Sequence, residues 1–329
     1  MRRVPSLRSL ALVTAATAAL VVPLVAVPAQ AAPAAPHSPA LAAPAAVAQA
    51  ADTADQQRVL RFWTPARMRS ATPMERIFKP SNAAATSVRR GLPHTVQGVA
   101  VKSIPNGGGP WTGGGAVTKT IGRVFFTYQG RTASCSGDAL TSANKSTVIT
   151  AGHCVKLDGA WHTNWVFVPG YTNGNAPYGT WTASKTLSTP QWTASEDINY
   201  DVGAAVVNQL NGQRLTDVVG GQGIGFNQAR GQAMYAFGYP AAAPYDGTKL
   251  IYCSGTVIND FLLSGDIGMN CNMTGGASGG PWFLKFTESS GTGTQNSVNS
   301  FKYNFLPNYM FGPYFGADAQ NLYNTAQNT

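Results

Sequence analysis

The sequence lacks several features that mark common classes of protein. Beyond the N-terminal leader region, no apolar run is long enough to span a bilayer, so no stable membrane association is expected. No Cys-x-x-Cys pair occurs, which argues against a zinc site, and we expect neither a metal nor a cofactor. Helical periodicity is scarce until Ala317–Ala326, where the pattern predicts a C-terminal helix.

Net positive charge is missing from the larger part of the chain. The 329 residues carry a formal net charge of +9. Residues 1–116 hold 12 Lys or Arg against 3 Asp or Glu, whereas residues 117–329 hold 11 of each sign. Binding to a phosphate backbone requires a positively charged face, so nucleic acid is not expected as a partner.

The first 31 residues have the pattern of a secretory signal peptide. Three arginines among the first eight residues precede a largely apolar stretch, Leu10–Val27, and the small-x-small sequence Ala29–Ala31 follows. A membrane anchor is the alternative, but Pro23 and Pro28 interrupt the apolar stretch. We therefore expect cleavage after residue 31 and a secreted, extracellular protein.

Residues 32–116 are interpreted as a pro-segment and flexible linker. Residues 32–56 are mainly Ala, Pro and Gln, with too little apolar surface to fold, whereas Val59–Phe78 is rich enough in large apolar residues to form a short helix or two. Lys79–Gly115 returns to Ala, Gly, Pro and Ser, which predicts a flexible, cleavable joint. Arg89-Arg90 is one candidate processing point, and a spacer that stays attached is the alternative.

Residues 117–329 have the sequence pattern of an all-β domain. Short runs rich in Val, Phe, Tyr, Trp and Thr alternate with Gly, Asn and Pro turns, which favours a β-sandwich or β-barrel. The predicted strands are Val124–Tyr128, Thr147–Thr150, Trp165–Val168, Gly203–Val207, Ala233–Phe237, Leu250–Ile258, Pro281–Phe286 and Val298–Tyr303.

All four cysteines, Cys135, Cys154, Cys253 and Cys271, lie in this domain. An even number in an exported chain indicates disulfides, and four cysteines allow three pairings. Proximity in sequence favours Cys135 with Cys154 and Cys253 with Cys271. Each loop of roughly 20 residues would then contribute about 3 kcal/mol of stability.

Only four histidines occur, and His37 and His94 lie in the leader region. A catalytic base in the β domain is therefore His153 or His162. His153 directly follows the apolar strand Thr147–Thr150, whereas His162 lies in a polar turn and is expected at the surface.

An acid and a nucleophile can be assigned to accompany this histidine. Asp201 stands at the start of an apolar strand, where a carboxylate needs a hydrogen-bonding partner, whereas Asp197 lies in a polar loop and is expected to be solvated. Ser278 sits in a glycine-rich stretch, Thr274–Pro281. The pattern Gly-x-Ser-x-Gly also matches the nucleophile elbow of α/β-hydrolases, but that class needs a histidine after the serine and none follows. The order His, Asp, Ser is that of chymotrypsin-type β-barrel enzymes.

Several motifs together resemble those of a known family. Thr150–Cys154, Asp201–Ala204 and Gly276–Pro281 resemble the three signatures of the trypsin-like (chymotrypsin-fold) serine peptidases. Further stretches look like landmarks of the secreted bacterial, glutamyl-endopeptidase-like branch and its pro-segment: Gly170-Tyr171, Pro177–Trp181, Phe237–Pro240 and Phe62–Pro65. The resemblance covers about residues 117–329.

The resemblance implies two six-stranded-type antiparallel β-barrels with the active site between them. His153 would act as general base and acid, Asp201 would orient it, and Ser278 would be the nucleophile. The backbone N–H groups of Gly276 and Ser278 would form the oxyanion hole.

Five residues bear on activation and specificity. Ala277 replaces an aspartate that in the animal enzymes pairs with a newly freed N-terminus, so activation through that ion pair is not expected. Asn272 stands where trypsin carries the aspartate that recognises basic side chains. Asn299 replaces a histidine of the glutamyl endopeptidases, although Lys302 could assist an acidic preference. Asn272, Ser300 and Lys302 are the candidate substrate-binding residues.

We therefore expect a secreted serine endopeptidase, made as a pre-proenzyme, that hydrolyses protein or peptide substrates through an acyl-enzyme. It is expected to be a monomer. The alternatives are a catalytically silent two-barrel module for binding or adhesion, and an esterase-like acyl hydrolase that uses the same triad.

Overall fold

The first barrel is a closed ring of six antiparallel strands. The structure is a computed structural model that describes residues 40–74, 88–95 and 105–329, so the predicted signal peptide lies outside the described residues. Hydrogen bonding runs in the order β5, β6, β7, β12, β11, β10 and back to β5. The strands are β5 (Ile121–Tyr128), β6 (Arg131–Ala139), β7 (Thr147–Thr150), β10 (Thr163–Pro169), β11 (Trp181–Ser188) and β12 (Gly203–Val207).

The second half of the domain is also built of strands. A seven-stranded sheet has the order β3, β13, β19, β18, β14, β15, β4, and a smaller sheet has the order β16, β17, β20. The bounds are β3 (His94–Thr95), β4 (Asn106–Pro110), β13 (Gly223–Phe226), β14 (Ala233–Gly238), β15 (Ile251–Thr256), β16 (Ile258–Asn259), β17 (Ile267–Asn270), β18 (Pro281–Thr287), β19 (Thr292–Val298) and β20 (Tyr309–Gly312). The predicted all-β class and the C-terminal helix, α6 (Ala317–Gln327), are confirmed.

The remaining elements are short. They are α3 (Val117–Thr120), α4 (Pro190–Ser195), α5 (Leu215–Val219), the 3-10 helices Gly152–Cys154 and Ile198–Tyr200, and the hairpin of β8 (Lys156–Leu157) with β9 (Ala160–Trp161). Among the described residues, no helix has the length and apolar character that crossing a membrane requires.

The predicted strands agree best where the sequence is most apolar. β7 and β12 have the predicted bounds. β6 and β11 were not predicted, because they are rich in Ser, Thr and Gly and are buried by their neighbours rather than by their own apolar side chains. The predicted strand Val298–Tyr303 is wrong, because β19 ends at Val298.

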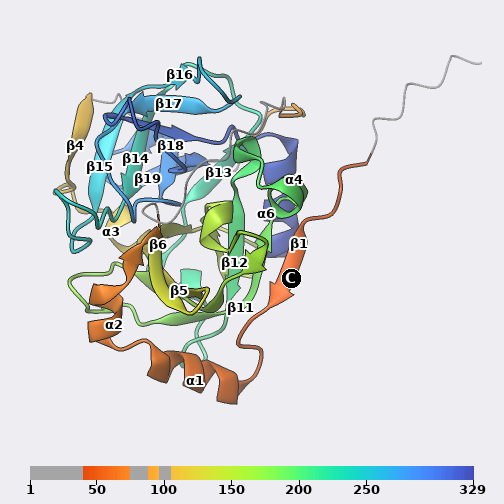
Figure 1. The fold of residues 1–329 in the computed structure, drawn as a ribbon, viewed down its shortest axis with the longest axis vertical. Helices are drawn as coiled ribbons and strands as arrows, with labels where there is room; N and C mark the ends of the chain where they lie inside the picture. Colours follow the sequence, from red (N-terminus) through yellow and green to blue (C-terminus); the bar gives the residue numbers. More distant parts are fainter. Residues whose placement is uncertain (1–39, 75–87, 96–104) are drawn as a thin grey trace, which may run out of the picture. The chain divides into compact units, whose positions relative to one another are not determined.

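The N-terminal segment of the described chain packs on the first barrel. β1 (Ala45–Ala48) pairs antiparallel with β11, so the prediction of an unfolded linker over residues 32–56 is wrong for these residues. Helices α1 (Thr53–Phe62) and α2 (Pro65–Ser70), orange in Figure 1, follow and agree with the prediction of one or two short helices. The short strand β2 (Thr72–Pro73) completes the segment.

Strand β5 explains why these helices dock. Its side chains alternate between two faces, as those of any strand do. Val124 and Phe126 point into the core of the first barrel, whereas Phe125 packs in a second cluster with Trp63 and Met68 of the N-terminal segment. Trp63 fixes the contact, since its indole N–H donates to the carbonyl of Asn164 over 2.6 Å.

Residues 106–117 are part of the second half of the domain, so the prediction of a flexible joint over Lys79–Gly115 is wrong for the end of that stretch. β4 pairs antiparallel with β15. Trp111 lies 5.4 Å from Phe237 and 5.1 Å from Tyr252, measured between ring centroids. The following N–H groups, of Ala116 and Val117, donate to backbone carbonyls of the turn after β18.

Candidate active site

Strand pairing in the first barrel brings His153 and Asp201 together. β7 leads into the 3-10 helix Gly152–Cys154, which carries His153. Asp201 follows the 3-10 helix Ile198–Tyr200 and precedes β12. Because β7 and β12 are antiparallel neighbours, with Gly203 opposite Thr150, the end of one strand meets the start of the other.

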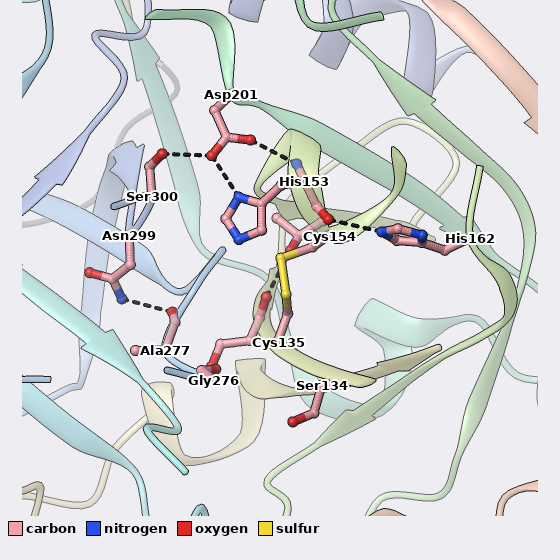
Figure 2. The surroundings of a disulfide bond; sticks show 12 residues. Ser134, Cys135, His153, Cys154, His162, Asp201, Gly276, Ala277, Asn299 and Ser300 are labelled. Atoms are coloured by element: carbon pink, nitrogen blue, oxygen red, sulfur yellow. Dashed lines mark hydrogen bonds and ion pairs between the residues drawn. A yellow bond between two sulfur atoms is a disulfide. The ribbon is translucent and has the colours of Figure 1, made fainter. Parts of the chain in front are cut away.

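The Asp201 carboxylate accepts three hydrogen bonds (Figure 2). Its Oδ2 lies 2.7 Å from His153 Nδ1 and accepts from the Ser300 hydroxyl over 2.6 Å. Its Oδ1 accepts from the backbone N–H of His153 over 2.7 Å. His153 and Asp201 are both fully buried, and these donors compensate the carboxylate for the loss of water. The contact to Nδ1 holds the imidazole in the tautomer that leaves Nε2 available as a base.

Asp197, the competing acid, has a structural role. It begins the 3-10 helix Ile198–Tyr200, and its carboxylate accepts from the backbone N–H of Asn199. It is only 6% exposed, so the expectation that it is solvated is wrong.

The Ser278 loop packs directly against the strands that carry the histidine. It connects β17 to β18, and the carbonyl of Ser278 accepts from the N–H of Ser136 on β6 over 2.7 Å. Gly279 has φ of 79°, and a Cβ there would lie 2.1 Å from the Thr150 hydroxyl at the end of β7. Only glycine permits both this backbone conformation and this close approach.

The backbone around Ser278 is held from inside the protein. The carbonyl of Gly275 accepts from the N–H groups of Ala241 and Ala242 over 2.6 and 3.1 Å. The carbonyl of Gly276 accepts from the Ser136 hydroxyl over 2.8 Å. Gly276 has φ of 96°, a region that residues with a side chain rarely adopt.

His162 is buried beside His153, so the expectation that it lies at the surface is wrong. It is 1% exposed, and its ring stacks on Phe126 with the centroids 4.3 Å apart. Its Nε2 lies 2.9 Å from the carbonyl oxygen of His153, so His162 donates to the backbone of His153 (Figure 2). Burial lowers the pKa of His162 to about 3, which keeps the ring neutral.

The three candidate substrate-binding residues have different surroundings. Ser300 binds Asp201, as described above. Asn272 accepts from the Tyr245 hydroxyl over 2.6 Å, and its backbone N–H donates to Gly107 of β4. Lys302 Nζ donates to the carbonyls of Cys271 and Pro307, which brings its charge close to the residue before Asn272.

Both locally paired disulfides are present. Cys135 joins Cys154, next to His153, and Cys253 joins Cys271, next to Asn272. The atoms of Cys135, His153 and Cys154 that could bind a metal lie within 4.8 Å of one another. These residues do not fit a metal site, because the two sulfur atoms are bonded to each other and His153 Nδ1 binds Asp201.

Comparisons with known proteins agree with this architecture. The chain is similar to the protease Anisep from Arthrobacter nicotinovorans, with 50% identity and a TM-score of 0.61 over 64% of this chain and 96% of that one. It is also similar to the thermostable serine protease AL20 from an extremophilic microorganism, with 45% identity and a TM-score of 0.62 over 65% and 99%. A Glu endopeptidase shares the fold at 16% identity and a TM-score of 0.53, covering 70% of this chain and all of that one.

A curated relative is matched over a short stretch only. The extracellular metalloprotease of Bacillus subtilis (strain 168) is 40% identical over 73 residues, which is 22% of this chain and 23% of the relative. No family model matches the sequence.

A closed barrel that carries His153 and Asp201, beside a second group of sheets that carries Ser278, agrees with the chymotrypsin-type fold of these solved proteases. The two solved proteases above share about half of their residues with this chain over nearly their whole length. The chain therefore belongs to the trypsin-like serine peptidases.

The buried His162 makes stability depend on pH in a defined direction. In the unfolded chain it takes up a proton near pH 6.5, whereas in the native protein it does so only near pH 3. Stability is therefore lost as the pH falls through this window, by up to about 1.4 kcal/mol per pH unit. His162→Gln keeps an N–H donor but cannot titrate.

Urea unfolding at pH 8 and pH 5 checks this prediction. The free energy of unfolding of the wild type should fall by about 2 kcal/mol relative to that of His162→Gln. Other titrating groups are common to both proteins and cancel in the difference. A difference between the proteins that stays constant with pH would contradict the assignment.

Proposed function

We propose that the chain is a secreted serine endopeptidase that acts through His153, Asp201 and Ser278. The hydrogen bond between His153 Nδ1 and Asp201, in a fully buried setting beside the Ser278 loop, is the observation that carries this proposal. His153 Nε2 takes the proton of the Ser278 hydroxyl as its oxygen attacks the substrate carbonyl. The protonated His153 then gives that proton to the leaving amine as the C–N bond breaks. Water attacks the resulting acyl-enzyme by the same route.

The N–H groups of Gly276 and Ser278 form the oxyanion hole in this proposal. In a trans peptide the C=O and the following N–H point in opposite directions. The carbonyl of Gly275 is held inward by Ala241 and Ala242, which directs the N–H of Gly276 outward. Removing one such donor typically lowers kcat by about 10²–10³.

The proposed specificity excludes a preference for basic side chains. Asn272 carries no charge, and its side-chain oxygen already accepts from Tyr245. The charge of Lys302 lies one residue away, at the Cys271 carbonyl. Protein or peptide substrates, export through the signal sequence and a monomeric state complete the proposal, and the two disulfides suit an extracellular setting.

The N-terminal segment acts as a pro-segment that covers the site. β2 pairs in parallel with β6, with Thr72 opposite Ala133 and Pro73 opposite Ser134. Two residues further along the same edge of β6, Ser136 binds the carbonyl of Ser278. The next residue of the segment, Met74, is fully buried in the core cluster of the first barrel. A strand docked here therefore pairs with β6 two residues before Ser136, the residue that binds the Ser278 loop.

Replacement of the nucleophile gives the direct test. Ser278→Ala should abolish hydrolysis of casein and labelling by a fluorophosphonate, because both require the Ser278 hydroxyl. Ser289→Ala, at an exposed serine, is the matched control and should retain both. Circular dichroism shows that each variant is folded. Hydrolysis by folded Ser278→Ala would contradict the proposed nucleophile. A processed wild type, without its N-terminal segment, that is unlabelled and inactive would favour a silent binding module.

Weakening the docked segment should activate the unprocessed protein. Met74→Asp places a carboxylate in an apolar, fully buried position, which favours release of β2. In a protein that also carries the whole N-terminal segment, we expect fluorophosphonate labelling at least about tenfold faster than in the parent, since about 1.4 kcal/mol of weakened docking suffices for that. Ser70→Asp, an exposed position on α2, is the control. Equal labelling rates for Met74→Asp and the parent would contradict the proposal that β2 inhibits the enzyme.

The processed enzyme should keep residues 106–116. They pair with β15 through β4 and bury much of Trp111, so cleavage at residue 116 would remove a strand of the second sheet. Intact mass measurement of the active, secreted form should therefore place its N-terminus at or before Asn106. Arg89-Arg90 satisfies this condition. A fully active form that begins at Val117 would overturn it.

A further inference from the structure

Ala277 raises a specific problem for the oxyanion hole. This residue precedes the nucleophile and has no charge with which an N-terminus could pair, yet the peptide between Ala277 and Ser278 must present the Ser278 N–H to the substrate. Because that peptide is planar and trans, whatever holds the Ala277 carbonyl also sets the direction of the Ser278 N–H.

The Ala277 carbonyl has two partners on the side away from the substrate. It accepts from the N–H of Gly280 over 2.9 Å, which is a local turn contact. It also accepts from the side-chain amide of Asn299 over 3.0 Å (Figure 2). Asn299 follows β19, so this second bond ties the turn to a different part of the second sheet.

Asn299 is itself held in one orientation. Its side chain is fully buried, and its Nδ2 also donates to the carbonyl of Phe237 over 2.8 Å. Its Oδ1 accepts from the indole N–H of Trp282 over 2.7 Å. Since the indole can only donate, it identifies the amide oxygen and leaves the NH₂ group to face Ala277 and Phe237.

The backbone of Asn299 strengthens the same connection. Its carbonyl accepts from the N–H of Gly279 over 2.7 Å, and its N–H donates to the carbonyl of Gly280 over 2.8 Å. One residue therefore holds three positions of the turn, Ala277 by its side chain and Gly279 and Gly280 by its backbone. Asn299 thus binds the turn both through its backbone and through its side-chain amide.

We infer that Asn299 is a positioning residue for the oxyanion hole. Its amide holds the Ala277 carbonyl inward and thereby aims the N–H of Ser278 at the developing oxyanion, a task that needs neither a charge nor a free N-terminus. Asn299 does not touch the substrate. This inference rests on the proposed serine peptidase function.

The test compares two buried asparagines of the same region. Asn299→Leu removes the donor to Ala277 and keeps the number and branching of the side-chain heavy atoms. Asn296→Leu is the matched control, because Asn296 is 2% exposed and its Nδ2 donates to the carbonyl of Gly225, outside the turn. Asn299→Leu also loses the bonds to Phe237 and Trp282, so the stability of both variants is measured and their activities are compared only per titrated site. Active-site titration with a fluorophosphonate first confirms that the wild type is a serine hydrolase and counts the functional molecules.

Two readouts isolate the oxyanion hole. For Asn299→Leu, kcat per titrated site on a peptide amide substrate should fall by about ten- to a hundredfold, with KM changed by less than about threefold. Affinity for a peptide boronate, whose tetrahedral adduct places an oxygen in the hole, should fall by a similar factor. Affinity for the matching uncleavable peptide should stay constant. Asn296→Leu should leave all three quantities unchanged per titrated site.

Each outcome separates this inference from the proposed function. An active wild type with equal kcat and boronate affinity in the two variants would overturn the role of Asn299 alone. An untitratable wild type from which the N-terminal segment has been removed would overturn the proposed function. If Asn299→Leu does not fold, Asn299→Ser is measured in the same way, since its shorter hydroxyl side chain is smaller and also lacks the amide.

Discussion

The antiparallel pairing of β7 with β12 is the constraint on which the site depends. It joins a strand that leads into the 3-10 helix of His153 to a strand that begins after Asp201, so the two side chains meet without any flexible connection. The Cys135–Cys154 disulfide fastens this 3-10 helix to β6. The Ser278 loop then packs against β6 and the end of β7, so its position depends on the closed first barrel.

A chain of buried polar contacts extends from this pairing into both halves of the domain. Ser300, which follows β19, binds Asp201 on the first barrel. Ser136, on β6, accepts from the N–H of Tyr239 and donates to the carbonyl of Gly276. Each contact satisfies a polar group that would be costly to bury alone. These contacts therefore hold the first barrel and the second half of the domain together at Asp201 and at the turn before Ser278.

The sequence was sufficient to predict the all-β class and the pairing of His153 with Asp201, because each rests on a local signal. His153 and Asp201 adjoin apolar strands, and Ser278 lies among glycines. His162 was misplaced because its burial comes from Phe126, 36 positions away on a neighbouring strand, and no local pattern reveals that contact. The hydrogen bond from Asn299 to the Ala277 carbonyl could not be predicted either, because it joins residues 22 positions apart that only the folded chain brings together.

The same reasoning explains the errors in the N-terminal part. The short Ala-rich run Ala45–Ala48 has little apolar surface of its own, and it forms a strand only because β11 offers a free edge. Trp111 stands in a glycine-rich stretch that resembles a linker, but three aromatic rings of the second sheet surround it. The composition of a segment shows how much apolar surface the segment itself has. It does not show which contacts the rest of the folded chain offers to that segment.

The carboxamide of Asn299 has a chemical property that an ion pair lacks. An α-amino group loses its charge near pH 8, so a turn held by an N-terminal ion pair loosens in alkaline solution. An amide neither gains nor loses a proton in this range. The turn before Ser278 is thus held by contacts that are insensitive to alkali and to salt.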